Sequence, residues 1–198
     1  MTVAGTEVVP PLVISIPDQA THQHSDLFVP KAFSIIEWTP AAESETLIAE
    51  RMGNKVHLSY QEDLGIIHRK YELFSEGFYV LKDVAGDLYG YAIFHPWIFG
   101  EPPRLNQYFD RIQDSCDSLH LHDIVVADEL RGRGHTSDFI RIFLEAAKNK
   151  GMPKATLVAV SGTESLWRHF GFHDPGFQSA KDALLSYSET SIYMARDL

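Results

Sequence analysis

The second half of the chain has the clearest pattern of apolar and polar positions. This pattern predicts two strands, at 119–126 and at 155–160. Between them it predicts a helix from 135 or 136 to about 150, because one helical face is apolar: Phe139, Ile140, Phe143, Leu144 and Ala147. Gly151 and Pro153 are suited to ending this helix. A strand, a helix and a parallel strand form a βαβ unit, so the pattern indicates an α/β fold.

Shorter patterns predict the elements around this unit. Thr39 and Pro40 are typical of a helix start, and Gly53 of a helix end. In chain order, we expect a strand at 32–37, helices at 41–52 and within 60–71, strands at 78–81 and 88–94, a loop at 96–104, short helices at 105–112 and 164–170, and strands at 172–178 and 191–196.

The first 30 residues follow no such pattern. Prolines interrupt short apolar stretches, which predicts an extended or loosely ordered arm at 1–30, followed by a single domain at 31–198. His22 and His24 lie in the arm, and we interpret them as part of a solvated loop because no third metal ligand lies nearby.

Composition and charge narrow the class of protein. The 198 residues are 44% hydrophobic, which is enough for one globular core. Acidic residues outnumber basic ones by 27 to 17, and the net charge of -10 disfavours nucleic acid and favours cationic small molecules. The single cysteine, Cys116, allows no intrachain disulfide, and no apolar run reaches the roughly 20 residues that span a bilayer. We therefore expect a cytoplasmic monomer or homodimer without a membrane partner.

A glycine-rich segment lies between the predicted strand and the long helix. It consists of Arg131, Gly132, Arg133, Gly134, His135 and Thr136. Two glycines allow a tight turn, and a helix N-terminus offers unpaired N–H groups, so the segment suits a pyrophosphate. Taken alone, a Gly-x-Gly segment is better explained as a basic surface turn. It is not the dinucleotide fingerprint, because Ser137 stands where a glycine is needed, and it is not a nucleotide P-loop.

The residues on either side of the segment make its interpretation more specific. The stretch at 126–134, Val-Ala-Asp-Glu-Leu-Arg-Gly-Arg-Gly, resembles the acetyl-CoA loop of the GNAT acetyltransferase superfamily. Arg131 and Gly134 match the superfamily pattern, whereas Thr136 departs from its last position. The stretch at 166–172, Leu-Trp-Arg-His-Phe-Gly-Phe, resembles the superfamily's short helix that ends in Gly-Phe. The resemblance implies a mixed, mostly antiparallel central sheet with flanking helices, in which splayed parallel strands bind acetyl-CoA.

The strand before the loop resembles a narrower group. Its sequence His-Leu-His-Asp-Ile-Val-Val, at 120–126, is similar to the His-Leu-His strand of the arylalkylamine (serotonin) N-acetyltransferases. The likeness is good over 118–175, vague over 33–109 and absent before Pro30. It implies an acetyl-CoA-dependent N-acetyltransferase whose acceptor is a small primary amine of the arylalkylamine type.

The resemblance also implies the site residues. His120 and His122 would pass a proton from the acceptor ammonium to water, and the loop at 131–136 would hold the pyrophosphate. The backbone of Ile124, Val125 and Val126 would bond the pantetheine arm. Histidine suits the first task, because its pKa of about 6.5 lies well below that of an alkylammonium, near 10.4. Because the two histidines lie two residues apart on a strand, their side chains share one face of the sheet. The residues alone also allow two structural histidines or, with less support, a zinc pair.

Trp167 departs from the superfamily, which places a tyrosine here to protonate the departing sulfur. An indole N–H is no usable acid, so we expect Trp167 to pack against the thioethanolamine, with Tyr187 or Tyr193 as possible substitute acids. An aromatic acceptor pocket could be lined by His95, Trp97, Phe99, Pro102 and Pro103, although these could equally pack among themselves. The candidates to hold the ammonium are Glu37, Glu62, Asp63 and Asp123.

Two other functions remain open on the sequence. The acceptor could be another amine metabolite, such as a polyamine or an amino sugar. A non-catalytic acyl-CoA-binding sensor would explain Trp167, but a sensor has no need of paired histidines.

Overall fold

A six-stranded sheet organises the chain. The structure, a computed structural model, describes residues 35–63, 65–160, 162–177 and 180–198. Across the sheet the strands keep their sequence order, β1 (Ile36–Pro40), β2 (Phe78–Asp83), β3 (Leu88–Trp97), β4 (Ser118–Val126), β5 (Lys154–Ala159) and β6 (Ile192–Asp197). Neighbouring strands are antiparallel except β4 and β5, which are parallel. This confirms the predicted mixed, mostly antiparallel α/β sheet.

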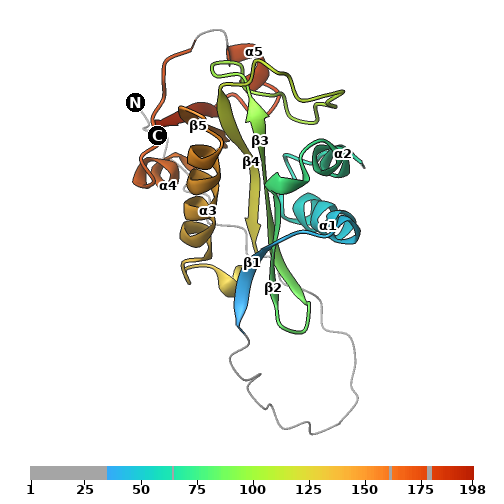
Figure 1. Ribbon diagram of the computed structural model, residues 1–198. Helices are drawn as coiled ribbons and strands as arrows, with labels where there is room; N and C mark the ends of the chain where they lie inside the picture. Colours follow the sequence, from blue (N-terminus) through green and yellow to red (C-terminus); the bar gives the residue numbers. More distant parts are fainter. Residues whose placement is uncertain (1–34, 64, 161, 178–179) are drawn as a thin grey trace, which may run out of the picture. The chain divides into compact units, whose positions relative to one another are not determined.

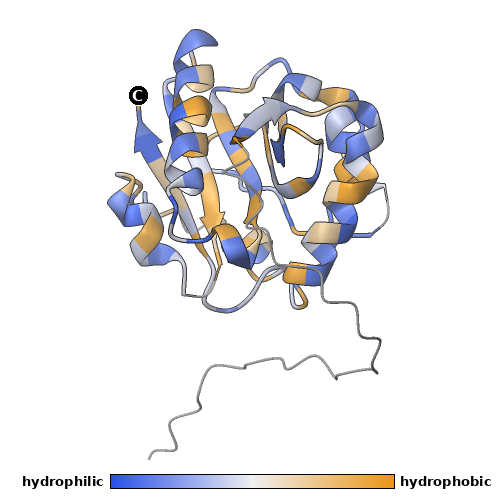
Figure 2. Ribbon diagram, turned by 90° about the horizontal axis from the view of Figure 1, so that it is seen from below, coloured by the Kyte–Doolittle hydropathy of each residue, from blue (hydrophilic) through white to orange (hydrophobic). Residues whose placement is uncertain are grey.

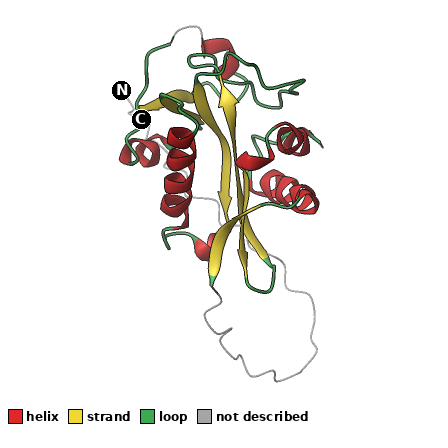
Figure 3. Cartoon of the chain, in the orientation of Figure 1, coloured by secondary structure: helices red, strands yellow, loops and turns green. Residues whose placement is uncertain are grey.

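Helices cover both faces of the sheet. On one face lie α1 (Thr46–Val56) and α2 (Ile66–Leu73), and on the other lie α3 (His135–Asn149) and α4 (Glu164–His169) (Figure 1). Between β5 and β6 the chain also forms α5 (Lys181–Leu184). Three 3-10 segments complete the described elements, η1 (Glu43–Glu45), η2 (Ser75–Gly77) and η3 (Asp128–Leu130), and Figure 3 separates helices, strands and loops by colour.

Each face of the sheet has its own apolar core. The larger core lies under α3, which buries the predicted positions Phe139, Ile140, Phe143 and Ala147 against β3, β4 and β5. The smaller core joins α1 and α2 to residues of β2, β3 and β4, among them Phe78, Tyr91 and Val125. Hydrophilic (blue) and hydrophobic (orange) residues alternate along the helices in Figure 2, as expected of amphipathic helices with one buried face.

The two parallel strands separate halfway along their length. β4 pairs with β5 from Ser118 only as far as Leu121, which lies opposite Leu157. Within the described residues, 122–126 have no partner on β5, although 123–126 continue to pair with β3. This is the splay that the resemblance implied, and among the described residues it leaves one edge of β4 open.

A β-bulge occurs in β4 at the point of separation. On β3, Phe94 lies opposite Leu121 and Ile93 lies opposite Asp123, so His122 is an extra residue in the register. A bulge breaks the strict alternation of side chains along a strand. Here His122 and Asp123 both contact residues on the α1 and α2 side, while Leu121 and Ile124 pack into the core under α3.

The start of the domain differs from the prediction. Thr39 and Pro40 do not begin a helix but end β1, opposite Val80 and Tyr79 of β2. Pro40 is tolerated because β1 is an edge strand, where a missing N–H need not break a ladder. The helix begins at Thr46 and continues through Gly53 to Val56, so Gly53 does not end it.

Two later predictions were also wrong. Residues 105–112 form no helix, because the Arg69 side chain bonds the carbonyl oxygens of Phe109 and Asp110 and holds this segment as a loop. The strand expected at 172–178 is reduced in its described part to one bridge, His173 with Ala195. The predicted arm at 1–30, with His22 and His24, lies outside the described residues. No helix in the described part of the chain is long and apolar enough to cross a membrane.

Gly53 gives a test of this packing. A Cβ on Gly53 would lie 2.0 Å from the buried Tyr91 hydroxyl. Gly53→Ala should therefore lower the free energy of unfolding by about 1–3 kcal/mol, although alanine normally stabilises a helix interior by about 1 kcal/mol. Chemical denaturation measures the change, with exposed Lys55→Ala on the same helix as control. A more stable Gly53→Ala protein would contradict the close contact with Tyr91.

Candidate active site

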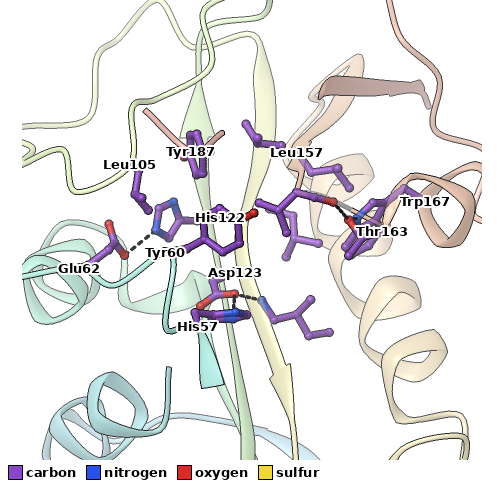
Figure 4. Close-up of a pocket in the computed structure, with 14 residues that line it drawn as sticks. His57, Tyr60, Glu62, Leu105, His122, Asp123, Leu157, Thr163, Trp167 and Tyr187 are labelled. Atoms are coloured by element: carbon purple, nitrogen blue, oxygen red, sulfur yellow. Dashed lines mark hydrogen bonds and ion pairs between the residues drawn. The ribbon is translucent and has the colours of Figure 1, made fainter. Parts of the chain in front are cut away.

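A pocket opens where β4 leaves β5. It encloses about 700 Å³, part of it open to solvent, and Figure 4 shows its lining. Its polar wall contains His57, Tyr60, Glu62, His122, Asp123, Thr163 and Tyr187, and its apolar wall contains Leu105, Leu121, Ile124, Leu157, Val158, Val160 and Trp167. This combination of apolar surface and a few converging polar groups is typical of a small-molecule site.

His122 lies on the polar wall, paired with Glu62. Its Nε2 is 2.9 Å from Glu62 Oε2, and only 3% of its side chain is exposed. Its Nδ1 is buried and has no hydrogen-bond partner within the described residues. When the ring is neutral and Nε2–H donates to Glu62, Nδ1 carries the free lone pair. An imidazole with one acceptor atom that lacks a partner among the described residues is suited to taking a proton from a ligand.

Glu62 is shared between His122 and Lys70. Lys70 Nζ donates to Glu62 Oε1 at 2.8 Å, and both side chains are buried. Burial alone would raise the pKa of Glu62, but the charge and hydrogen bond of His122, followed by those of Lys70, hold this pKa well below its ordinary value. Burial lowers the pKa of Lys70, and Glu62 opposes that change. Glu62 is thus an ionised carboxylate that fixes the orientation of the His122 ring.

His120 shares the face of His122 but lies outside the pocket. Its Nδ1 is 2.9 Å from Thr156 Oγ1, its ring stacks on Tyr193, and it is 1% exposed. His95 lies next to both histidines, with ring centroids 5.7 Å from His120 and 5.9 Å from His122. Burial, with the charges of His95 and His122, drives the pKa of His120 well below 6.5. His120 is therefore neutral at physiological pH and does not line the pocket.

Asp123 forms a second pair, with His57. His57 Nε2 lies 3.2 Å from Asp123 Oδ1, and the Tyr91 hydroxyl donates to Asp123 Oδ2. The hydrogen bond to Asp123 raises the pKa of His57, while burial acts in the opposite direction. Burial would raise the pKa of Asp123, but the bonds from His57 and Tyr91 hold it below its ordinary value. Sequence analysis missed His57, Tyr91 and Lys70, because no local motif connects them with β4.

Trp167 lies in the wall opposite Glu62 in Figure 4. It is 7% exposed, packs against Phe170 and Phe172, and its Nε1–H donates to Thr163 Oγ1 at 3.2 Å. An indole that is packed and already hydrogen-bonded fits a structural wall. The packing of Trp167 against a thioethanolamine stays a prediction.

The two substitute tyrosines differ in position. Tyr187 lines the pocket, and its hydroxyl donates to the carbonyl oxygen of Pro103 at 3.1 Å. Burial raises the pKa of Tyr187, so its hydroxyl keeps its proton at neutral pH. Tyr193 does not line the pocket, and its hydroxyl accepts the N–H of Gly100 at 3.1 Å. Of the two, only Tyr187 lies in the pocket wall, but its raised pKa and its bond to Pro103 O make it a poor proton donor.

The glycine-rich segment lies at the start of α3, as predicted. Gly132 has φ of +74° and Gly134, the N-terminal cap residue, has φ of +91°. No atom lies within 4 Å of a Cβ built on either glycine, and no side chain caps the helix. Arg131 and Arg133 are exposed. An uncapped helix N-terminus with open space in front of it and two arginines beside it fits the pyrophosphate of coenzyme A.

The three residues expected to bond the pantetheine arm do not all direct their backbone groups to the open edge of β4. Ala127 N–H donates to Tyr89 O of β3 at 2.7 Å. Alternate residues in an antiparallel ladder face the same neighbour, so the N–H and C=O of Val125 also face β3. Those of Ile124 and Val126 face the open edge, although Ile124 N–H is donated to Asp123 Oδ1 at 2.8 Å. The geometry thus favours Ile124 and Val126 over Val125 for the pantetheine arm.

The expected aromatic acceptor pocket is not formed by residues 95–103. Trp97 stacks on Phe109 with a centroid distance of 4.6 Å, and Phe99 packs edge-on against Phe177 at 5.0 Å. None of the five suggested residues lines the pocket at β4. Trp97 also packs edge-on against His95, so the loop follows the alternative interpretation in part, while its other aromatic contacts are with Phe109 and Phe177 outside it.

The four acidic candidates separate into two groups. Glu62 and Asp123 lie in the pocket wall. Glu37 is exposed on β1, and Asp63 accepts a hydrogen bond from the side chain of Asn106 at 2.8 Å. Only two of the four are therefore placed to act on a ligand in the pocket.

Solved structures of other proteins share this fold. Neither a family model nor a curated protein sequence matches the chain. A GNAT-family acetyltransferase from Listeria monocytogenes is similar, with a TM-score of 0.53 and 15% identity over 82% of this chain and 95% of that chain. N-acetylglutamate synthase from Neisseria gonorrhoeae, in complex with coenzyme A and N-acetyl-glutamate, has a TM-score of 0.61 and 12% identity over 83% of this chain and 35% of that chain.

A third similar structure carries a different chemistry. The GNAT-like decarboxylase GphF, in complex with isobutyryl-CoA, has a TM-score of 0.62 and 12% identity over 81% of this chain and 98% of that chain. The chain therefore has the fold of the GNAT acetyltransferases, with its pocket at the splayed strands. This fold serves more than one reaction of acyl-CoA, and the comparisons do not favour the arylalkylamine group over the others.

The buried carboxylate of Glu62 predicts how stability changes with pH. Because its pKa is lower in the folded than in the unfolded protein, its contribution is complete above the unfolded value of about 4.3 and is lost as pH falls below it. Glu62→Gln should flatten this part of the stability curve. At pH 7 it should cost about 3–5 kcal/mol, since Lys70 is left buried without a charged partner.

Denaturation at pH 3 to 7 measures both effects. Glu129→Gln is the matched control, because it removes an exposed carboxylate outside the pocket. Equal pH dependence in Glu62→Gln and in the parent would mean that Glu62 is not held ionised by His122 and Lys70.

Proposed function

We propose that this protein is an acetyl-CoA-dependent N-acetyltransferase whose acceptor is a small primary amine of the arylalkylamine type. One observation carries the proposal above all others. His122 lies in the pocket at the splay of β4 and β5, with Nε2 fixed by Glu62 and Nδ1 buried without a partner among the described residues. This is the arrangement of a general base held in one orientation by a carboxylate.

The reaction requires such a base. An alkylammonium ion has no lone pair on nitrogen, so it must lose a proton before it can attack the thioester carbonyl. His122 Nδ1 would accept this proton, and Glu62 would stabilise the imidazolium that forms. The departing thiolate would take up the proton that His122 accepts, because the Tyr187 hydroxyl is bonded to Pro103 O and burial raises its pKa. Acetyl-CoA would lie between β4 and β5, with its pyrophosphate at the start of α3.

The lining of the pocket supports one class of amine over others. Glu62 and Asp123 are both already bonded to cationic or donor groups, so neither carboxylate is available for a second ammonium. The remaining wall is largely apolar, with Tyr60 and Leu105 on the Glu62 side in Figure 4. These features favour an acceptor with one amine and an apolar body over a polyamine or an amino sugar.

A thiol-release assay with acetyl-CoA tests this function. The panel contains phenylethylamine, tryptamine, spermidine and glucosamine. Release of coenzyme A and formation of the N-acetyl product should be fastest with phenylethylamine or tryptamine. Cofactor binding without product from any amine would favour the acyl-CoA sensor, and preference for spermidine would contradict the apolar acceptor.

A histidine variant tests the base within the same assay. His122→Gln keeps a hydrogen-bonding side chain but removes the base, and kcat/KM should fall roughly a hundredfold. His120→Gln should lose far less, because His120 does not line the pocket and is already neutral. Equal losses in both variants would instead support a relay through the two histidines, and an unchanged His122→Gln would exclude His122 as the base.

The loop before α3 is tested separately by cofactor binding. Coenzyme A binds the native state only, so it should raise the Tm of the parent protein. Gly134→Asp places a negative charge at the expected pyrophosphate and should abolish the shift. Gly151→Asp is a matched control at the other end of α3, because Gly151 also has a positive φ (+68°) and open space around its Cβ. A full shift in folded Gly134→Asp would exclude the loop as the pyrophosphate site.

A further inference from the structure

The pocket contains a second histidine–carboxylate pair besides His122 and Glu62. His57 directly follows α1, and its backbone N–H bonds Gly53 O at 2.7 Å, which fixes the place of the residue. Its ring reaches the pocket wall, where Nε2 lies 3.2 Å from Asp123 Oδ1 (Figure 4). The bulge in β4 brings the two pairs together, because His122 and Asp123 are consecutive residues that both contact the α1 and α2 side.

Asp123 is positioned to orient His57 and not to bind a ligand itself. Oδ1 accepts the Ile124 N–H at 2.8 Å as well as facing His57 Nε2, and Oδ2 accepts the Tyr91 hydroxyl. Three donors thus surround the carboxylate. With Nε2–H directed at Asp123, the neutral His57 ring has Nδ1 as its proton acceptor. The arrangement is that of an imidazole held by a carboxylate for acid–base work.

The two histidines differ in their access to solvent. The His57 side chain is 27% exposed, against 3% for His122. The acetyl transfer proposed above, R–NH3+ with CH3CO–SCoA to R–NH–COCH3 with CoA–SH, removes two protons from the acceptor nitrogen. One proton ends on sulfur, and one leaves to water. A buried imidazole alone has no direct route for the second proton.

We propose that His57, oriented by Asp123 and Tyr91, is a second base of the site, which takes the net proton of the reaction from the acceptor nitrogen to solvent. This inference rests on the proposed function. In it, the nitrogen–carbon bond forms as the carbon–sulfur bond breaks. His122 takes the first proton and returns it to the departing sulfur, while His57 takes the second and releases it to water through its exposed side. Asp123 is a positioning residue, because it acts through His57.

The charged groups around His57 give the expected pH dependence. Asp123 of β4 acts most strongly and raises the pKa, Glu62 raises it further, and Arg131 lowers it. Tyr91 acts through its bond to Asp123. Because the pKa of His57 is raised, kcat/KM should increase with pH through an inflection above the ordinary histidine value of about 6.5. Removal of the Asp123 charge should move this inflection to lower pH.

Three variants test the proposal in the thiol-release assay with phenylethylamine. His57→Gln should lose at least about tenfold in kcat/KM and lose the inflection, with an unchanged Tm shift on binding coenzyme A. Asp123→Asn should shift the inflection downwards. The control is His68→Gln on α2, because His68 also lies near carboxylates, of Glu43 and Glu72, but outside the pocket at β4. His68→Gln should behave as the parent protein does.

Rescue separates a base from a structural residue. Because the His57 side chain is partly exposed, His57→Ala leaves a space that free imidazole can enter, and imidazole should restore part of the lost rate. Loss of activity without rescue, or a His57→Gln protein with the parent rate and pH profile, would overturn the proposal for His57 alone. A parent protein that acetylates no amine of the panel would overturn both this inference and the proposed function.

Discussion

The parting of β4 from β5 after Leu121 is the constraint on which the site depends. As long as two strands are paired, their backbone groups satisfy one another and leave no room for a ligand. Beyond Leu121 the edge of β4 is open while its other edge stays paired with β3, so the strand remains fixed. The bulge at His122 lies at this point, and it lets two consecutive side chains face one pocket. Without it, His122 and Asp123 would lie on opposite faces of the sheet.

The polar wall of the pocket is stable because its charges are paired. A buried ion that has no partner costs several kcal/mol, and a buried carboxylate would then take up a proton. Lys70 from α2 and His122 surround Glu62, while His57 and Tyr91 surround Asp123. α1 and α2 therefore do more than cover the sheet. α2 supplies Lys70, and His57 directly follows α1. Together with His122 and Tyr91 of the sheet, they keep two carboxylates ionised beside the open edge of β4.

The fold and the chemistry are separate conclusions. The GNAT fold accounts for the splayed strands and the open N-terminus of α3, and acetyltransferases and a decarboxylase share it. The acetyl transfer proposed for this chain depends on side chains that are not part of the fold as such, above all on the open Nδ1 of His122. Trp167 illustrates the same point, since it stands where the sequence resemblance implies a tyrosine while its N–H is bonded to Thr163.

The sequence by itself determined the elements that short-range pattern controls. The βαβ unit of β4, α3 and β5 and the glycine-rich turn at Gly134 were predicted correctly, because periodicity and backbone freedom are local properties. Helix ends that depend on distant contacts were not. Gly53 lies inside α1 and does not end it. The missing side chain of this glycine makes room for Tyr91, which lies 38 positions further along the chain.

The tertiary structure alone decided which side chains meet at the site. His57 and Glu62 come from the connection between α1 and α2, Tyr91 comes from β3 and Asp123 from β4, and no sequence motif connects these three segments. The two histidines of β4 looked equivalent in sequence, but the structure buries His120 against Thr156 and leaves His122 in the pocket wall. Burial and pairing of charge depend on residues that pack together from across the chain, so only the folded protein sets which imidazole is free to act.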